Sequence, residues 1–175
     1  SQGVTMGQLS EALRGTLQSE RTLLFADCCF SGGLETVARE LEASGLAAAT
    51  LTSAASWLPS TSNWTFTLSL LDGLNGRASV DRDADRQVTL AEIASEVGDA
   101  MHFHENQQHG MTSPPWLDKL VMARAPAAEP ALRGPIERYR YVKFELPNGF
   151  WKTGRVLDFR DGHFSIEVQG YSART

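Results

Sequence analysis

Segments of helical and strand periodicity alternate through the first 125 residues of the chain. Apolar side chains recur every three to four positions in four segments, which predicts amphipathic helices. These segments are residues 6–17, 34–45, 64–76 and 90–101. Three short apolar runs are typical of buried strands, at residues 21–28, 48–55 and 119–125. Strands that alternate with helices predict an α/β domain, with a mostly parallel sheet covered by helices on both faces.

The pattern changes beyond residue 125. Small residues and prolines without periodicity fill "APAAEPALRGP", so residues 126–135 are expected to link a first domain, residues 1–125, to a second one. In residues 136–175, apolar and polar positions alternate, and the turn sequences "PNG" and "RDG" separate the runs. This pattern predicts a small all-β, SH3-like barrel, incomplete because the sequence stops before a closing strand.

Composition and charge narrow the classes of protein. The chain is 42% hydrophobic and 21% charged, which is typical of a globular protein. The net charge of −5 argues against nucleic acid as a partner. No apolar run approaches the roughly 20 residues of a membrane helix, and the N-terminus lacks the pattern of a secretory signal. The two cysteines are adjacent, so we expect no disulfide framework and a reducing, cytoplasmic location.

The stretch "FADCCFSGG" at residues 25–33 is the candidate for chemistry. It places an acid, two thiols and a glycine-rich turn at the carboxyl end of a predicted strand, where open α/β folds build their sites. A cysteine there can act as a nucleophile, and amides of the turn can hold an oxyanion. The alternatives are that both cysteines are small core residues and that Asp27 caps the glycine turn.

The motif Asp27-x-Cys29-x-Ser31-Gly32 closely resembles the nucleophile motif of caspase-like cysteine peptidases, in their metacaspase and bacterial orthocaspase branch. The segments "ATLTSAASW", "TFTLSLLDGLNG", "VDRDADRQVTLAEI" and "ENQQHGMTSPPW" with "LVMARA" are similar to the segments that follow it in that family. The resemblance spans residues 1 to about 125 and lacks the N-terminal third of the family domain.

The resemblance implies a cysteine endopeptidase that needs no cofactor and cuts protein substrates after Arg or Lys. Cys29 would be the nucleophile and Cys28 its buried neighbour, since the two point to opposite sides of a strand. Asp27 would bind the basic side chain before the cut. The backbone amides of Cys29 and Gly32 would hold the oxyanion. Further pocket residues would be Ser53 and Trp57.

The histidine base is the main departure from the family. In the family it precedes the cysteine, whereas all four histidines here follow Cys29, at positions His102, His104, His109 and His163. His109-Gly110 copies the family's dipeptide but lies in a polar, proline-flanked loop. We therefore expect the base on an upstream segment, as a companion chain cut from the same precursor by autoprocessing. The alternatives are a fragment, or a catalytically inactive adaptor that presents the barrel to a partner.

Residues 81–92, "DRDADRQVTLAE", have the spacing of an EF-hand calcium loop. The candidate ligands are Asp81, Asp83, Asp85, the Gln87 carbonyl and Glu92. Arg86 stands where that loop needs glycine. The alternative is a helix start, because Thr89 and Glu92 make a capping box.

The C-terminal module, "YVKFELPNGFWKTGRVLDFRDGHFSIEVQGY", resembles Tudor and chromo-barrel domains. Trp151, Phe159 and Tyr171 could surround a methylated cation. The alternative is that Phe150 and Trp151 fill a small core. Either way, the resemblance implies a docking or substrate-recruiting module.

Overall fold

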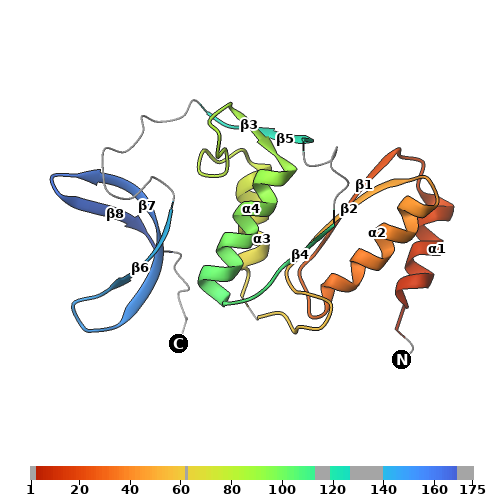
Figure 1. The fold of residues 1–175 in the computed structure, drawn as a ribbon, viewed down its shortest axis with the longest axis horizontal. Helices are drawn as coiled ribbons and strands as arrows, with labels where there is room; N and C mark the ends of the chain where they lie inside the picture. Colours follow the sequence, from red (N-terminus) through yellow and green to blue (C-terminus); the bar gives the residue numbers. More distant parts are fainter. Residues whose placement is uncertain (1–2, 62, 113–118, 127–139, 169–175) are drawn as a thin grey trace. The chain divides into compact units, whose positions relative to one another are not determined.

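The computed structural model describes residues 3–61, 63–112, 119–126 and 140–168. The chain divides into two units, Ser1–Pro126 and Ala127–Thr175 (Figure 1). The boundary falls at the first residue of the predicted linker, and the rest of that linker lies outside the described residues. In the described part of the chain, no helix combines the length and the apolar character needed to span a membrane.

The first unit contains the helices and strands that the periodicity predicts, together with two short strands that it does not. In chain order they are α1 (Met6–Thr16), β1 (Arg21–Ala26), α2 (Leu34–Ala43), β2 (Ala47–Thr52), α3 (Thr65–Leu74), β3 (Gln87–Thr89), α4 (Leu90–Ala100), β4 (Gly110–Thr112) and β5 (Val121–Arg124). Capping boxes start two helices, Thr5 with Gln8 at α1 and Thr89 with Glu92 at α4. The box at Thr89 confirms the helix start predicted there from the sequence.

The main sheet has the order β1–β2–β4. β1 and β2 pair in parallel and α2 connects them, which confirms a β–α–β unit. β4 runs antiparallel to β2, with Gly110 opposite Thr52. β5 does not join this sheet, because it pairs antiparallel with β3 in a separate two-stranded sheet. Of the three pairings between described strands of this unit, one is parallel and two are antiparallel, so a mostly parallel sheet is not confirmed, whereas the mixed α/β class is confirmed.

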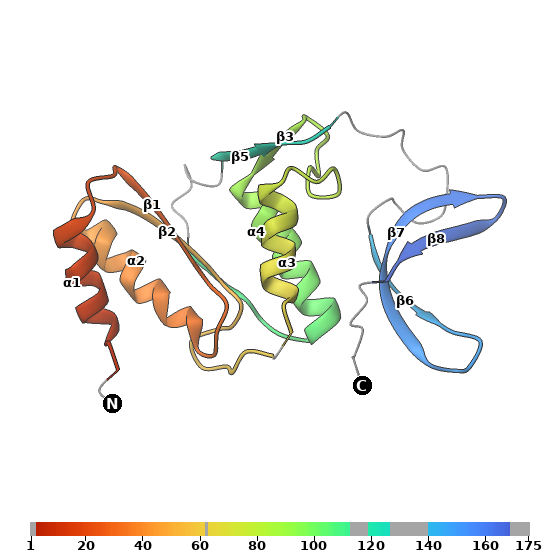
Figure 2. The same cartoon turned by 180° about the vertical axis from the view of Figure 1, so that it is seen from behind.

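Helices cover both faces of the main sheet (Figure 1), as the view from behind confirms (Figure 2). On one face Leu24 and Ala48 of the strands pack against α1 and against α2, which contributes Leu41. On the other face Phe25 and Leu51 pack against the apolar stripes of α3 and α4. Successive strand residues thus face opposite layers. The predicted stripe of α4 is buried at Leu90, Ile93 and Val97, and at Met101, in the π-helical turn that follows α4.

The second unit is an antiparallel meander of β6 (Tyr141–Glu145), β7 (Trp151–Arg160) and β8 (His163–Glu167). Its turns confirm the two turn predictions, because Gly149 and Gly162 have φ of 81° and 80°. The described residues form a three-stranded sheet and not a closed barrel. Phe150 is 69% exposed, so the interpretation that it fills a core is wrong. Phe159 packs on Phe164, with ring centroids 4.6 Å apart.

The other two parts of the predicted aromatic cage, the Trp151 side chain and Tyr171, lie outside the described part of the structure. Phe159 is thus the one predicted wall that the structure places, and it belongs to a packed aromatic pair. Binding of a methylated cation stays a prediction.

Candidate active site

Asp27, Cys28 and Cys29 come directly after β1 and line one open pocket. Its volume is about 440 Å³. The other described residues that line it are Ser60, Thr61, Asn63 and Trp64. The predicted nucleophile and the predicted specificity residue therefore share a pocket at the carboxyl end of a parallel strand, which is where the sequence motif led us to expect them.

Both thiols are exposed. The interpretation of the cysteines as core residues is therefore wrong, and so is the prediction that Cys28 is a buried neighbour. The reason is that β1 ends at Ala26, so the alternation of a strand does not extend to the cysteines. A turn replaces it, in which Phe30 is left-handed with φ of 58° and the Ser31 N–H donates to the Cys28 carbonyl at 3.2 Å.

The glycine-rich turn is fixed against the loop that follows β2. The Gly32 N–H donates to the Ala54 carbonyl at 2.8 Å, and the Ser31 Oγ accepts from the Ala54 N–H at 3.2 Å. A Cβ on Gly32 would lie 2.4 Å from the Ser56 nitrogen, so this close approach requires glycine. The Gly32 amide is thus already bonded and does not serve as an oxyanion donor in this arrangement. The Cys29 amide has no backbone acceptor within the described residues.

Asp27 is held by a residue that the sequence analysis did not single out. Its Oδ2 accepts from the Thr67 hydroxyl on α3 at 2.7 Å. Among the described residues no hydrogen bond joins the Asp27 carboxylate to the glycine turn, so the interpretation of Asp27 as a cap of that turn is not supported. In the described part of the chain no cationic side chain pairs with Asp27. The carboxylate therefore lines the pocket without a cationic partner among the side chains that the structure describes.

Gln107 holds the loop after β2, which contributes Ser60 and Thr61 to the Cys29 pocket, through three hydrogen bonds. It is 8% exposed, and its side-chain amide donates to the carbonyls of Ser53 and Pro59 at 3.0 and 3.1 Å. Its Oε1 accepts from the Thr61 N–H at 3.1 Å. Nearby, Glu105 accepts from Asn63 and Thr65, at the start of α3. The sequence carried no signal for these roles, because both residues lie in a polar stretch without periodicity.

Ser53 and Trp57 are not among the described residues that line the pocket. Ser53 is buried behind it, with its Oγ 3.4 Å from the Oγ of Ser60, so it supports a wall residue. Trp57 is 70% exposed. Trp64, at 64% exposure, takes the place at the pocket that we had expected of Trp57.

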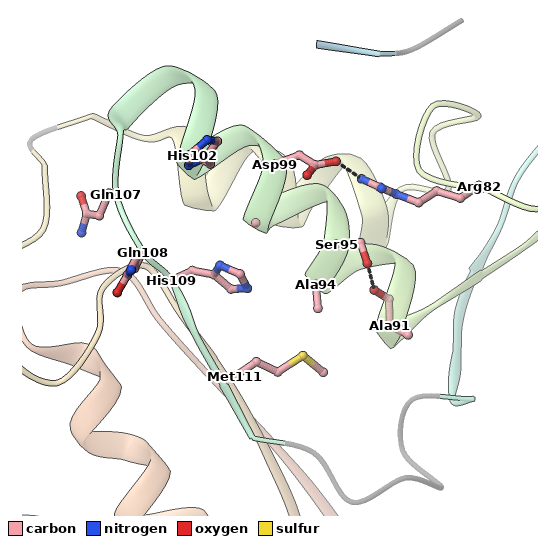
Figure 3. Close-up of a pocket in the computed structure, with 11 residues that line it drawn as sticks. Arg82, Ala91, Ala94, Ser95, Asp99, His102, Gln107, Gln108, His109 and Met111 are labelled. Atoms are coloured by element: carbon pink, nitrogen blue, oxygen red, sulfur yellow. Dashed lines mark hydrogen bonds and ion pairs between the residues drawn. The ribbon is translucent and has the colours of Figure 1, made fainter. Parts of the chain in front are cut away.

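A second pocket, of about 740 Å³, lies between α4 and the segment that leads into β4 (Figure 3). His109 projects into it toward α4, and His102 lines it from the turn after α4 (Figure 3). Burial lowers the pKa of His109 below its usual value, and the charge of Asp99 opposes this only in part. No described residue lining the Cys29 pocket is a histidine, whereas two histidines line this one.

The acidic residues of the predicted calcium loop converge. Asp81, Asp83 and Asp85 each offer a carboxylate oxygen, and these oxygens lie within 4.8 Å of one another. Glu92 accepts from the Thr89 N–H at 2.9 Å, as the capping box requires, and from the Arg82 N–H at 2.7 Å. The acidic cluster and the helix cap therefore coexist in one loop.

Comparisons with protein-family models, with curated proteins and with solved structures find no match for this chain. The chemistry of the site must therefore be read from its own residues. Those are an exposed thiol, a carboxylate held by one hydroxyl, and a turn that requires glycine at residue 32.

Proposed function

We propose that the first unit is a caspase-like cysteine endopeptidase in which Cys29 attacks the peptide bond that follows an Arg or Lys residue. One observation carries this proposal. The exposed Cys29 thiol and the Asp27 carboxylate, which has no cationic partner among the described residues, line the same pocket. A nucleophile beside an uncompensated negative charge suits a substrate with a basic side chain next to the bond that is cut.

Asp27 would select the basic side chain. A carboxylate accepts two parallel N–H bonds from a guanidinium, and it accepts one bond from the more compact ammonium of Lys. The Thr67 hydroxyl fixes one carboxylate oxygen, so the orientation of Asp27 is set before a substrate arrives. A substrate with Asp before the cut would place two negative charges together and be rejected.

The reaction would proceed through an acyl-enzyme. The Cys29 thiolate attacks the carbonyl carbon, and the Cys29 N–H stabilises the oxyanion that forms. The C–N bond then breaks, and a histidinium gives its proton to the leaving amine. Water next attacks the thioester and passes a proton to the histidine, and the carboxylic acid leaves as the Cys29 thiolate and the histidinium are regenerated.

The histidine would come from an upstream segment of the same precursor, kept as a companion chain after autoprocessing. One edge of β1 supports this arrangement, because none of the described strands pairs with it. β1 is only half-buried, although Leu23, Leu24 and Phe25 give it the composition of a central strand, whereas β2 is almost fully buried. A strand added in parallel to that edge would end beside Cys29. Two exposed, unlinked thiols also suit a reducing, cytoplasmic compartment.

Peptidyl electrophiles test the proposal, because they report the thiol and its specificity pocket together. We would treat the chain with chloromethyl ketones that end in Arg or in Asp and follow adducts by intact mass. We expect one adduct with the Arg reagent, lost in Cys29→Ala and retained in the matched control Cys28→Ala. In Asp27→Asn the preference for the Arg reagent should fall at least about tenfold, as the charged contact is lost.

Two outcomes would contradict the proposal. One is labelling of Cys28 in place of Cys29, and the other is an equal rate with both reagents. Hydrolysis of reporter peptides by the chain together with its upstream segment then tests turnover. An Arg-selective adduct without any turnover in that sample would favour the inactive adaptor.

A further inference from the structure

We propose that residues 81–92 bind one Ca²⁺ ion through the side chains of four acidic residues and one backbone carbonyl. This site is separate from the Cys29 pocket and does not depend on the proposed peptidase activity. The ligands would be the carboxylates of Asp81, Asp83, Asp85 and Glu92 and the carbonyl of Gln87.

Asp81 carries the inference. It is 8% exposed, and its Oδ1 is buried without a hydrogen-bond partner among the described residues. Its Oδ2 accepts from the Arg86 N–H at 2.9 Å. A buried carboxylate oxygen that has no donor is costly unless it is paired or binds a metal. Carboxylate oxygens of Asp83 and Asp85 lie within 4.8 Å of a carboxylate oxygen of Asp81. A cation bound between the three groups would supply the partner that the buried Asp81 oxygen lacks.

No side chain of the described residues neutralises this cluster. The Arg82 guanidinium is turned toward α4, where it pairs with Asp99 at 2.7 Å and with Glu96 at 3.8 Å. Arg86 is exposed and makes no ion pair in the described part of the chain. Burial raises the pKa of Asp81, and the negative charges of its acidic neighbours raise it further. The three carboxylates therefore repel one another unless a cation lies between them.

The loop already brings the twelfth residue back to the first. The Glu92 Oε1 accepts from the Arg82 N–H at 2.7 Å, so the Glu92 carboxylate lies beside the start of the loop. Positions 1, 3, 5, 7 and 12 are the ligand positions of a calcium loop. Position 6, where such loops have glycine for a sharp turn, is Arg86 with φ of 70°. The helix start need not be lost, because the Thr89 Oγ1 accepts from the Glu92 N–H at 3.2 Å.

The donors favour Ca²⁺ over Mg²⁺. Four carboxylates and a carbonyl supply more oxygens than Mg²⁺ usually takes from protein, since Mg²⁺ keeps most of its water and demands a strict octahedron. Asp83, Asp85 and Gln87 are exposed, so they can adjust to the longer bonds and the higher coordination number of Ca²⁺.

Calorimetric titration of the whole chain with CaCl₂ and with MgCl₂, after removal of metal with EDTA, tests the site. Asp83→Asn removes one ligand charge and keeps an oxygen for the turn hydrogen bond from Asp85. Glu92→Gln removes a charge and keeps the capping box, which accepts glutamine. Asp161→Asn changes an exposed aspartate of the second unit and is the matched control. We expect one Ca²⁺ per chain, with affinity at least about tenfold weaker in both loop variants and unchanged in the control.

Thermal unfolding supplies a second readout. Without Ca²⁺, Asp83→Asn should raise the unfolding midpoint, since it relieves repulsion, and with saturating Ca²⁺ the wild-type chain should gain more than the variant. If the acidic residues had a purely structural role, Ca²⁺ would not raise the unfolding midpoint of the wild-type chain more than that of the variant. The proposal is overturned if the wild-type chain shows no binding up to the millimolar range of the weakest calcium loops. It is also overturned if both loop variants bind Ca²⁺ as the wild type does, or if Mg²⁺ binds as tightly.

Discussion

Two adjacent glycines in the turn after Cys29 offer a sharp test of how the site is held. A Cβ on Gly32 would lie 2.4 Å from the Ser56 nitrogen and 2.8 Å from the Ala55 carbonyl carbon, and both are backbone atoms that cannot move alone. Overpacking of this kind costs about 1–3 kcal/mol. Weakening of the Gly32 N–H bond to Ala54 adds about 0.5–1.5 kcal/mol. We therefore expect Gly32→Ala to lower the free energy of unfolding by about 1.5–4.5 kcal/mol.

Gly33→Ala is the matched control. Gly33 has φ of −56°, and a Cβ there would meet only the Met6 side chain, at 3.6 Å or more. Alanine should be neutral, or stabilising by about 0.4–1 kcal/mol through the unfolded chain. Urea unfolding followed by far-UV circular dichroism reports on this unit, since it contains all the α-helices that the structure describes. A difference between the two variants below about 1 kcal/mol would refute the argument that close backbone approach selects glycine at residue 32.

Three further predictions follow from buried or strained groups. Gln107→Leu leaves the partners of a buried amide unsatisfied and should cost about 2–4 kcal/mol in urea unfolding, whereas Gln108→Leu, at an exposed position, should cost little. Burial lowers the pKa of His109 below 6.5, so its contribution to stability is complete above pH 6.5 and is lost as the pH falls toward the folded-state value. In His109→Gln the free energy of unfolding should therefore depend less on pH below about 6.5 than it does in the wild-type chain. An unchanged dependence on pH would contradict this. Arg86 has a left-handed backbone, which costs a non-glycine residue about 1–2 kcal/mol, so Arg86→Gly should remove this strain. The greater chain entropy of glycine in the unfolded state offsets about 0.5–1 kcal/mol of that gain. The variant should also bind Ca²⁺ more tightly in calorimetry.

The helices and the long strands could be predicted because local patterns determine them. The boxes at Thr5 and Thr89 mark where α1 and α4 begin, and the buried stripe of α4 has helical spacing. β3 and β4 could not be predicted, because three residues are too few to show a period of two. The sequence likewise could not predict that β4 runs antiparallel to β2, because tertiary contacts determine which strands pair and in which direction.

The site was predictable where one short stretch contains it. Asp27 and Cys29 do share a pocket, but the exposure of Cys28 depends on where β1 ends, and strand ends are poorly marked in a sequence. Thr67 and Gln107 were missed for a different reason. Their partners lie 40 or more residues away, and a hydrogen bond of that kind leaves no periodic signal.

The pairing of β4 with β2 has a consequence for how the chain folds. Thr52 and Gly110 face each other although they lie 58 positions apart in the sequence, whereas β1, α2 and β2 are consecutive. Loop closure makes the distant pairing slower, so the parallel pair should form first and β4 should join after α3 and α4 have docked. Until then one edge of β2, "AAATLT", is open, uncharged and rich in small apolar residues. A growing chain is therefore most exposed to aggregation after residue 52 has been made and before residue 112 has been added.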